Sequence, residues 1–291
     1  MRLANELGGE IVSVDSMQVY RGLDIGTAKP SAADQAAVVH HLIDVADPKE
    51  SFSVAEYQRL GVRAVDEILD RSVTPVLVGG SGLHFRALVD PLVFPPTDDA
   101  VRGEIEALDP ADAVLELLAA DPAAGEAVDL ANPRRVARAL EVYRVTGETP
   151  STRRRSYGAI AVRNYTPRLP LIVIGIDPGD RLADRIEQRF DAMLEAGLLE
   201  EVAVVAPRLG VTAAQGVGYK ELLPVTAGET TLEEGRAAAI SATRALGKRQ
   251  RTFFRRDPRI SWIPWHDGAG NAVEDGVAAV LQAIEESAWT S

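Results

Sequence analysis

Asp15 is the residue whose type and position point most directly to chemistry. It follows residues 10–14, a short apolar run that is typical of a buried strand. In open α/β sheets, functional sites form outside the carboxyl ends of the strands. A carboxylate there can accept a proton or hold Mg²⁺ through water, whereas a purely structural aspartate would cap the next turn. Position alone leaves both interpretations open.

Two glycine-containing segments could hold an anion. Residues 79–82, Gly-Gly-Ser-Gly, follow an apolar run and precede a helical pattern, so the turn offers backbone N–H groups to a phosphate. The segment lacks the GxxxxGK[ST] pattern of a P-loop, and a plain tight turn explains it equally well. Residues 22–30 form a second such loop, whose single lysine, Lys29, is a weak signal alone.

Two basic segments could contact a polyanion. Arg134 and Arg138 stand four residues apart and share one face of a predicted helix, although surface pairing with Glu141 is an equal alternative. Residues 248–256 combine a run of bases with two phenylalanines. Arginine binds phosphates and aromatic rings stack on nucleic-acid bases, although such phenylalanines more often belong to a core.

Composition excludes several other kinds of site. The chain has no cysteine, so a disulfide, a thiol nucleophile and a thiolate metal site are ruled out. The four histidines, at positions 40, 41, 84 and 266, lack metal-site spacing, and no GxSxG motif is present. No apolar run approaches the ~20 residues that span a bilayer, and the start of the chain lacks a signal-peptide core. A cytoplasmic protein without membrane contact is expected.

The net charge of −12 does not exclude a nucleic-acid partner, because the charge is unevenly distributed. Residues 98–129 hold ten acids and one base, whereas residues 151–168 hold five arginines and no acid. Residues 244–259 hold seven bases and one acid. Because electrostatic fields are screened over a Debye length of ~10 Å, such local patches of charge determine the binding partner more than the net charge does.

The periodicity predicts the elements that bring these segments together. Strands are predicted over residues 10–14, 41–45, 74–78, 169–176 and 259–264. Helices are predicted over 53–69, 82–88, 101–128, 132–147, 180–199, 231–254 and 272–286, and 151–168 is only weakly periodic. The alternation predicts an α/β fold with a parallel sheet. The expected domains are an α/β core over 1–97, a helical insertion over 98–168, and the return of the core over 169–291.

Taken together, these segments resemble the bacterial tRNA dimethylallyltransferases. The matches follow the order of the family and cover nearly the whole chain: residues 14–22, 24–30, 78–85, 132–143, 215–220 and 243–255. The most specific are Asp-Ile-Gly-Thr-Ala-Lys-Pro at 24–30 and the Lys-Arg-Gln string at 248–250 with the aromatics after it.

The resemblance implies a P-loop-NTPase-like α/β core with an inserted helical domain that binds tRNA. It implies transfer of a dimethylallyl group from dimethylallyl diphosphate, with Mg²⁺, to N6 of an adenosine. That adenosine lies 3′ of the anticodon in tRNAs reading codons that begin with U. A monomer is expected.

The resemblance also assigns roles to residues of this sequence. Asp15 would be the general base on the N6 proton, and Ser81 would touch substrate inside the reaction channel. The residues expected to contact tRNA are Asp15, Ser16, Met17, Gln18, Arg102, Arg134, Arg135, Val136, Ala137, Arg138, Gln215, Gly216, Val217, Gly218, Tyr219, Lys220, Lys248, Arg249, Gln250, Arg251, Thr252, Phe253, Phe254 and Arg255.

The chain departs from the family in one large respect. The GPTxSGK[ST] loop that binds diphosphate in the family has no match in this sequence. We therefore expect the strand that carries Asp15 to lack a neighbour, and the chain to be inactive until upstream residues are added. Two other functions stay open. A kinase of P-loop class acting on small molecules or nucleotides would not need the basic segments, and an inactive tRNA-binding remnant would not need the P-loop.

Overall fold

The computed structural model describes residues 1–177, 179–264 and 272–286, and His266 lies outside them. The chain folds into two compact units. Residues 1–88 and 171–291 make up the first, here called the core unit, and residues 89–170 the second, the helical unit. Within the described residues, no helix is long and apolar enough to cross a membrane.

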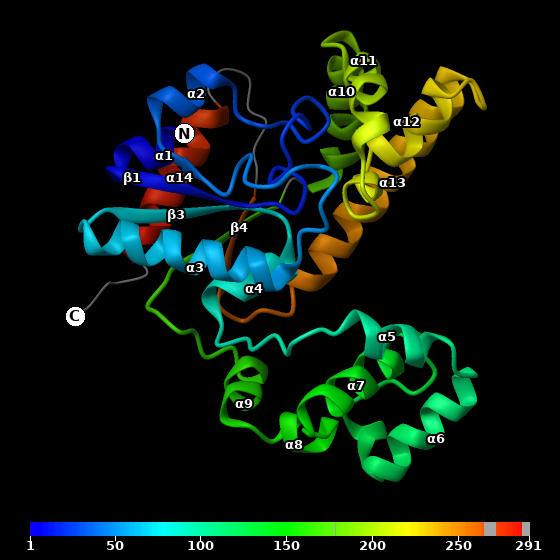
Figure 1. The fold of residues 1–291 in the computed structure, drawn as a ribbon. Helices are drawn as coiled ribbons and strands as arrows, with labels where there is room; N and C mark the ends of the chain where they lie inside the picture. The colour runs from blue at the N-terminus through cyan, green and yellow to red at the C-terminus, as the bar shows by residue number, and fades with distance from the viewer. Residues whose placement is uncertain (178, 265–271, 287–291) are drawn as a thin grey trace. The chain divides into compact units, whose positions relative to one another are not determined.

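Strands and helices alternate in the first half of the core unit. The elements are α1 (Arg2–Glu6), β1 (Gly9–Val14), α2 (Ala32–Ala37), β2 (His40–His41), α3 (Val54–Asp70), β3 (Thr74–Gly79) and α4 (Gly82–Val89). The three strands form one parallel sheet in the order β2–β1–β3, and α3 packs along β1 and β3 (Figure 1). The predicted α/β class with a parallel sheet is confirmed.

The strand that carries Asp15 at its end is paired on both edges. On one edge Ile11 and Val12 stand opposite the two residues of β2. On the other edge all of β1 pairs with β3, from Gly9 opposite Thr74 to Val14 opposite Gly79. The expectation that this strand lacks a neighbour is therefore wrong, because β1 lies in the middle of its sheet.

The predicted strand over residues 41–45 is also wrong beyond its first residue. Leu42 and Asp44 adopt φ angles of 63° and 56°, in the left-handed region that an extended strand excludes. Pairing therefore ends at His41. The following residues instead bring Asp44 and Ala46 beside the loop after β1, where the backbone N–H of Ala46 donates to the carbonyl of Val19.

The second half of the core unit is mostly helical. Its elements are β4 (Val173–Asp177), η2 (Gly179–Arg181), α10 (Leu182–Glu195), α11 (Leu198–Val205), η3 (Ala206–Arg208), η4 (Ala213–Gln215), α12 (Tyr219–Thr226), α13 (Leu232–Phe254), β5 (Ile260–Pro264) and α14 (Ala272–Glu286). β4 and β5 form a two-stranded parallel sheet, and α10 to α13 pack on one another (Figure 1). The single helix predicted over 180–199 is wrong, because Gly197, with φ of 99°, separates α10 from α11.

The helical unit contains α5 (Asp99–Glu106), α6 (Pro110–Ala120), η1 (Ala124–Glu126), α7 (Pro133–Thr146), α8 (Pro150–Arg154) and α9 (Tyr157–Arg163). α7 begins and ends as predicted, since Asn132 caps it by accepting from the N–H of Arg135 and Gly147 is left-handed at its end. The continuous helix predicted over 101–128 is wrong, because Asp109 caps a new helix there. The core of the helical unit is formed by the buried residues Ile105, Ala113, Leu117, Ala124, Val136 and Leu140.

Candidate functional site

Asp15 stands directly after β1 and turns the chain there. Its Oδ1 accepts hydrogen bonds from the backbone N–H of Met17 at 2.7 Å and of Gln18 at 3.3 Å. Among the residues that the structure describes, Oδ2 accepts no hydrogen bond and is therefore left for a ligand. The same side chain thus caps a turn, as a structural aspartate would, and keeps one oxygen for chemistry.

The carboxylate opens on a cleft of about 910 Å³ in the core unit. The predicted site residues that line it come from four segments of the chain: Asp15, Ser16 and Met17; Ser81; Gln215, Gly216, Val217, Gly218 and Tyr219; and Arg249, Gln250 and Phe253. The fold therefore brings together residues that are more than 230 positions apart in the sequence. Arg185 and Arg189 of α10 also line the cleft, so three arginines share it with Asp15.

Ser81 is held close to the end of β1 by its own backbone. Its N–H donates to the carbonyl of Val14, the residue before Asp15, at 3.2 Å. Its hydroxyl lies 2.7 Å from Nδ1 of His84, which is buried one turn further along. The turn after β3 thus ties Ser81 to the residue before Asp15, and Ser81 and Asp15 line the same cleft.

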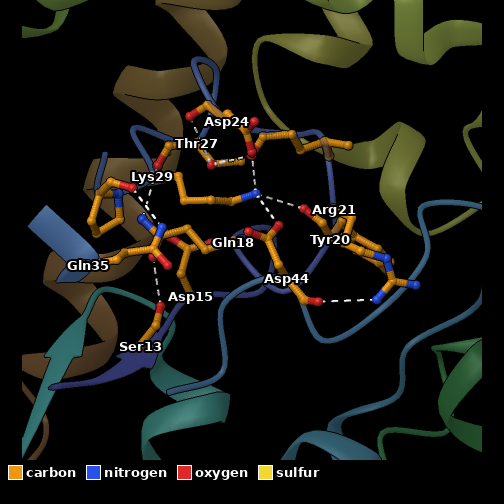
Figure 2. Close-up of polar contacts among 12 residues, drawn as sticks. Ser13, Asp15, Gln18, Tyr20, Arg21, Asp24, Thr27, Lys29, Gln35 and Asp44 are labelled. Atoms are coloured by element: carbon orange, nitrogen blue, oxygen red, sulfur yellow. Dashed lines mark hydrogen bonds and ion pairs between the residues drawn. The ribbon is translucent and has the colours of Figure 1, made fainter. Parts of the chain in front are cut away.

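The buried side chain of Lys29 fastens the loop over residues 22–30 to the rest of the core unit. Figure 2 shows Lys29 between Asp24 and Asp44. The ammonium group donates to Asp24 at 2.5 Å, to Asp44 at 2.7 Å and to the carbonyl of Tyr20 at 2.9 Å, and the side chain is only 3% exposed. These partners take up its three N–H donors, so Lys29 stabilises the loop.

Gln18 joins the same loop to β1. Its side chain accepts from the hydroxyl of Ser13 at 2.8 Å and donates to the carbonyl of Thr27 at 3.2 Å (Figure 2). Thr27 lines the cleft beside Gly26. Gln18 itself is not among the lining residues, so in this structure it supports the wall of the cleft.

Glu201 of α11 fastens the loop from the opposite side. Its carboxylate accepts from the backbone N–H of Asp24, Ile25 and Gly26 at 3.1, 2.8 and 3.1 Å, and from the hydroxyl of Tyr219 at 2.5 Å. Burial raises the pKa of Tyr219, and the neighbouring carboxylate adds to the rise, so the phenol stays protonated as the donor. One carboxylate therefore joins the loop to α12.

The basic end of α13 packs against the turn that carries Ser81. A β-carbon on Gly82 would come within 2.3 Å of the ring of Phe253, and one on Gly80 within 2.5 Å of Gln250. Phe253 and Phe254 meet edge to face, with ring centres 5.4 Å apart. The two aromatics thus contribute to packing here, while Phe253 also remains 39% exposed.

The bases of α13 differ in their partners. Arg251 and Arg255 both donate to Asp177, at the end of β4, at 3.1 and 3.2 Å. Arg249 lines the cleft and makes no ion pair with any residue that the structure describes. Lys248, Thr252, Phe254 and Arg255 do not line the cleft, and Lys220 lines a separate surface groove formed by α11, η3 and α12.

Two of the predicted tRNA contacts of the helical unit, Arg102 and Arg138, pair with Glu141, which is 1% exposed, whereas Arg134 lies exposed on the surface. Arg138 donates to this carboxylate at 2.7 Å and Arg102 at 3.0 Å, and these partners hold the pKa of Glu141 below its usual value despite burial. Arg135 lies 3.6 Å from Asp129. Val136 is buried, with Ala137 packed against the same core, so this segment also has a structural role.

The family model for IPP transferase matches residues 18–257. The chain belongs to the IPP transferase family. It is 42% identical to a tRNA dimethylallyltransferase of Streptomyces coelicolor, with 90% of this chain and 84% of that protein aligned. It is 43% identical to the Salinispora arenicola protein of the same name, with 98% and 82% aligned.

Solved structures agree with the IPP transferase assignment. A tRNA delta(2)-isopentenylpyrophosphate transferase of Staphylococcus epidermidis superposes with a TM-score of 0.69 at 29% identity, covering 99% of this chain and 94% of that one. A tRNA isopentenylpyrophosphate transferase of Bacillus halodurans gives 0.68 at 36%, covering 98% and 91%. A eukaryotic dimethylallyltransferase acting on tRNA gives 0.76 at 23%, covering 98% and 75%, which shows a shared fold. The P-loop-NTPase-like fold class is confirmed.

Arg185 and Arg189 are the site residues of this IPP transferase chain that sequence reasoning missed. A signal was present, because they stand four residues apart on α10 and so share one helix face. The apolar residues Ile186 and Phe190 of the same helix are buried, and the two arginines lie beside them. His84 and Glu201 were also missed, because His84 was given no role although it lies inside the matched segment 78–85, and Glu201 lies outside every matched segment.

The described residues do not form a magnesium site by themselves. No three His, Cys, Asp or Glu side chains within the described ranges come together as metal ligands. Asp15 is the one carboxylate among the residues found to line the cleft. Mg²⁺ in proteins is commonly bound by one or two carboxylates together with substrate phosphates. Mg²⁺ therefore stays a prediction.

Proposed function

We propose that this protein transfers a dimethylallyl group from dimethylallyl diphosphate to N6 of the adenosine 3′ of the anticodon, in tRNAs that read codons beginning with U. The observation that carries the proposal is the carboxylate of Asp15. Its Oδ1 accepts a backbone hydrogen bond, and the side chain opens on a cleft that three arginines also line. Membership of the IPP transferase family supports the reaction class.

Asp15 acts as the general base. The exocyclic amine of adenine is a weak nucleophile, because its lone pair is delocalised into the ring. It attacks C1 of the allyl group, the C1–oxygen bond breaks, and diphosphate leaves with the bonding electrons. The proton lost from N6 goes to Oδ2 of Asp15, while Oδ1 keeps its hydrogen bond to the N–H of Met17 at 2.7 Å. A positioned base typically contributes about 10²–10⁴-fold in rate.

The arginines of the cleft supply positive charge for the reaction. Charge develops on diphosphate as the allyl bond breaks, and fixed cations stabilise that transition state. Arg185, Arg189 and Arg249 line the cleft together with Asp15. These arginines meet the leaving diphosphate or a phosphate of the tRNA next to the adenosine.

The remaining tRNA contacts are proposed for the basic end of α13, the segment 215–220 and the helical unit. The target adenine must leave its stack to enter a cleft, at a cost of a few kcal/mol. Phosphate contacts that position the anticodon loop offset that cost. In the helical unit, Arg134 and the exposed edges of Arg102, Arg135 and Arg138 are the proposed contacts.

Allyl transfer to unmodified tRNA is the direct test. The protein is purified both as given and with in-frame upstream residues that supply a GPTxSGK[ST] loop. Each form is incubated with dimethylallyl diphosphate and a tRNA that reads U-initial codons, and the digested nucleosides are analysed by mass spectrometry. Because the diphosphate-binding loop has no match in this sequence, we expect N6-dimethylallyladenosine from the extended form, and none from the same tRNA with guanosine at that position. Phosphoryl transfer from ATP to a small molecule without any allyl transfer would favour a kinase instead. Binding of tRNA without allyl transfer under saturating conditions would overturn the proposal.

A further inference from the structure

His84 is a buried polar side chain that the proposed reaction does not use. It is 8% exposed, and its ring meets the Tyr57 ring edge to face with centres 4.5 Å apart. Its Nδ1 lies 2.7 Å from the Ser81 hydroxyl oxygen. We propose that His84 is a positioning residue, whose Nδ1 accepts the hydrogen bond of the Ser81 hydroxyl and so directs the lone pairs of that oxygen at the substrate amine. The inference rests on the proposed function.

Ser81 and Asp15 are placed to accept hydrogen bonds from the same group, the exocyclic amine of the substrate. The N–H of Ser81 donates to the carbonyl of Val14, so the serine is tied to the chain one residue before the carboxylate. Both residues line the cleft. An exocyclic amine carries two N–H donors and needs two acceptors. Asp15 can accept one hydrogen, and Ser81 can accept the other only if its own hydrogen points elsewhere.

The surroundings of His84 favour a neutral ring that can accept. Burial lowers the pKa of His84, and the carboxylate of Asp15 counteracts this only in part. A neutral imidazole has one N–H and one free lone pair. The hydroxyl of Tyr57 is committed to the carbonyl of Ser13 at 2.7 Å, so it does not compete for the ring.

The opposite tautomer would work against the reaction. If Nδ1 carried the hydrogen, it would donate to Ser81, and the serine hydrogen would turn toward the cleft. There it would meet the hydrogens of the substrate amine, which repel it. A protonated His84 would have the same effect and would also place a positive charge near Asp15.

A double-mutant cycle tests whether His84 acts through Ser81. His84→Phe keeps an aromatic ring against Tyr57 but removes the acceptor. We expect it to lower kcat for allyl transfer about 10-fold, with the KM for dimethylallyl diphosphate unchanged. His84→Asn, whose amide oxygen can lie near the position of Nδ1, should recover most of that loss. In a Ser81→Ala background, His84→Phe should have no further effect. The inference is overturned if the kcat losses of the two single variants multiply in the double variant, or if His84→Asn recovers none of the loss. Either result would make His84 a packing residue.

Nitrogen-15 NMR of the histidine rings gives a readout that needs no activity. At pH 7.5 we expect His84 in the form protonated at Nε2, and the Nδ1-protonated form would overturn the inference. This separates the two proposals, because a wild-type protein without allyl transfer would refute the proposed function and leave the tautomer result valid. His40→Phe is the matched control. It replaces a histidine of β2 that does not line the cleft, and should leave transfer unchanged.

Discussion

Gly26 lies so close to the ring of Tyr219 that a β-carbon on the glycine would come within 2.6 Å of the ring carbon Cε2. Tyr219 is fully buried, and its hydroxyl is bound by Glu201, so the ring cannot move aside easily. The loop over residues 22–30 therefore reaches the wall of the cleft because position 26 has no side chain.

Gly26→Ala should displace either the loop or Tyr219. We expect the free energy of unfolding to fall by about 1–3 kcal/mol, which is typical of overpacking, and allyl transfer to fall with it. Urea denaturation and the transfer assay measure the two effects. Gly103→Ala is the control, because a β-carbon there meets nothing within 4 Å and alanine favours helix α5. Equal stability of the two variants would contradict the close packing at Gly26.

Asp15→Asn should separate the structural role of this side chain from its chemical role. Asparagine keeps an oxygen that can accept from the N–H of Met17, so the turn after β1 should persist. It cannot take the N6 proton, and we expect turnover to fall at least about 10²-fold with little change in tRNA affinity.

Single-turnover kinetics and a filter-binding titration measure these quantities. Asp109→Asn is the matched control, since Asp109 likewise accepts from a backbone N–H two residues on, at the start of α6. It should leave turnover unchanged. An Asp15→Asn protein with wild-type turnover would remove Asp15 from the general-base role.

Binding of tRNA should weaken steeply with salt, because each phosphate contact releases counterions. Arg249 makes no ion pair with the described residues, so Arg249→Ala should reduce the slope of log K against log salt by about 1. Arg251 is engaged with Asp177, and we expect a smaller change in slope from Arg251→Ala. Equal slopes for both variants and the wild type would place these arginines outside the tRNA interface.

Stability should decrease in acid through Glu10 of β1. A hydrogen bond from Arg71 is the main cause that lowers the pKa of this buried carboxylate from 4.5 to about 2. Because the folded-state pKa is depressed, the stabilisation is fully present above pH 4.5 and is lost as the pH falls toward 2.

Glu10→Gln should therefore cost about 1–3 kcal/mol at pH 7, and the difference from wild type should shrink between pH 4.5 and 2. Urea midpoints over this pH range measure it. Glu67→Gln is the control, because Glu67 forms an exposed pair with Arg63 and should change stability little at any pH. A pH-independent cost for Glu10→Gln would mean that packing, and not charge, is lost.

Elements with local signals could be predicted from the amino-acid sequence alone. The apolar run before Asp15 became β1, and the glycine turn at 79–82 joined β3 to α4. Asn132 and Gly147 marked the two ends of α7, because a cap acts within a few residues of itself. The order of the motifs was enough to predict the family and the α/β class.

The grouping of residues into one site, and the pairing of polar groups with each other, became visible only in the folded chain. Arg251 was predicted to contact tRNA because it lies in a basic run, yet its partner Asp177 lies 74 residues away, at the end of β4. In the sequence Lys29 is a single cation in a loop, whereas in the structure its ammonium group donates to the carboxylate of Asp44. Such pairings depend on burial and on distances between segments far apart in the chain. No local pattern records them, because backbone pairing and side-chain packing choose those neighbours only when the chain folds.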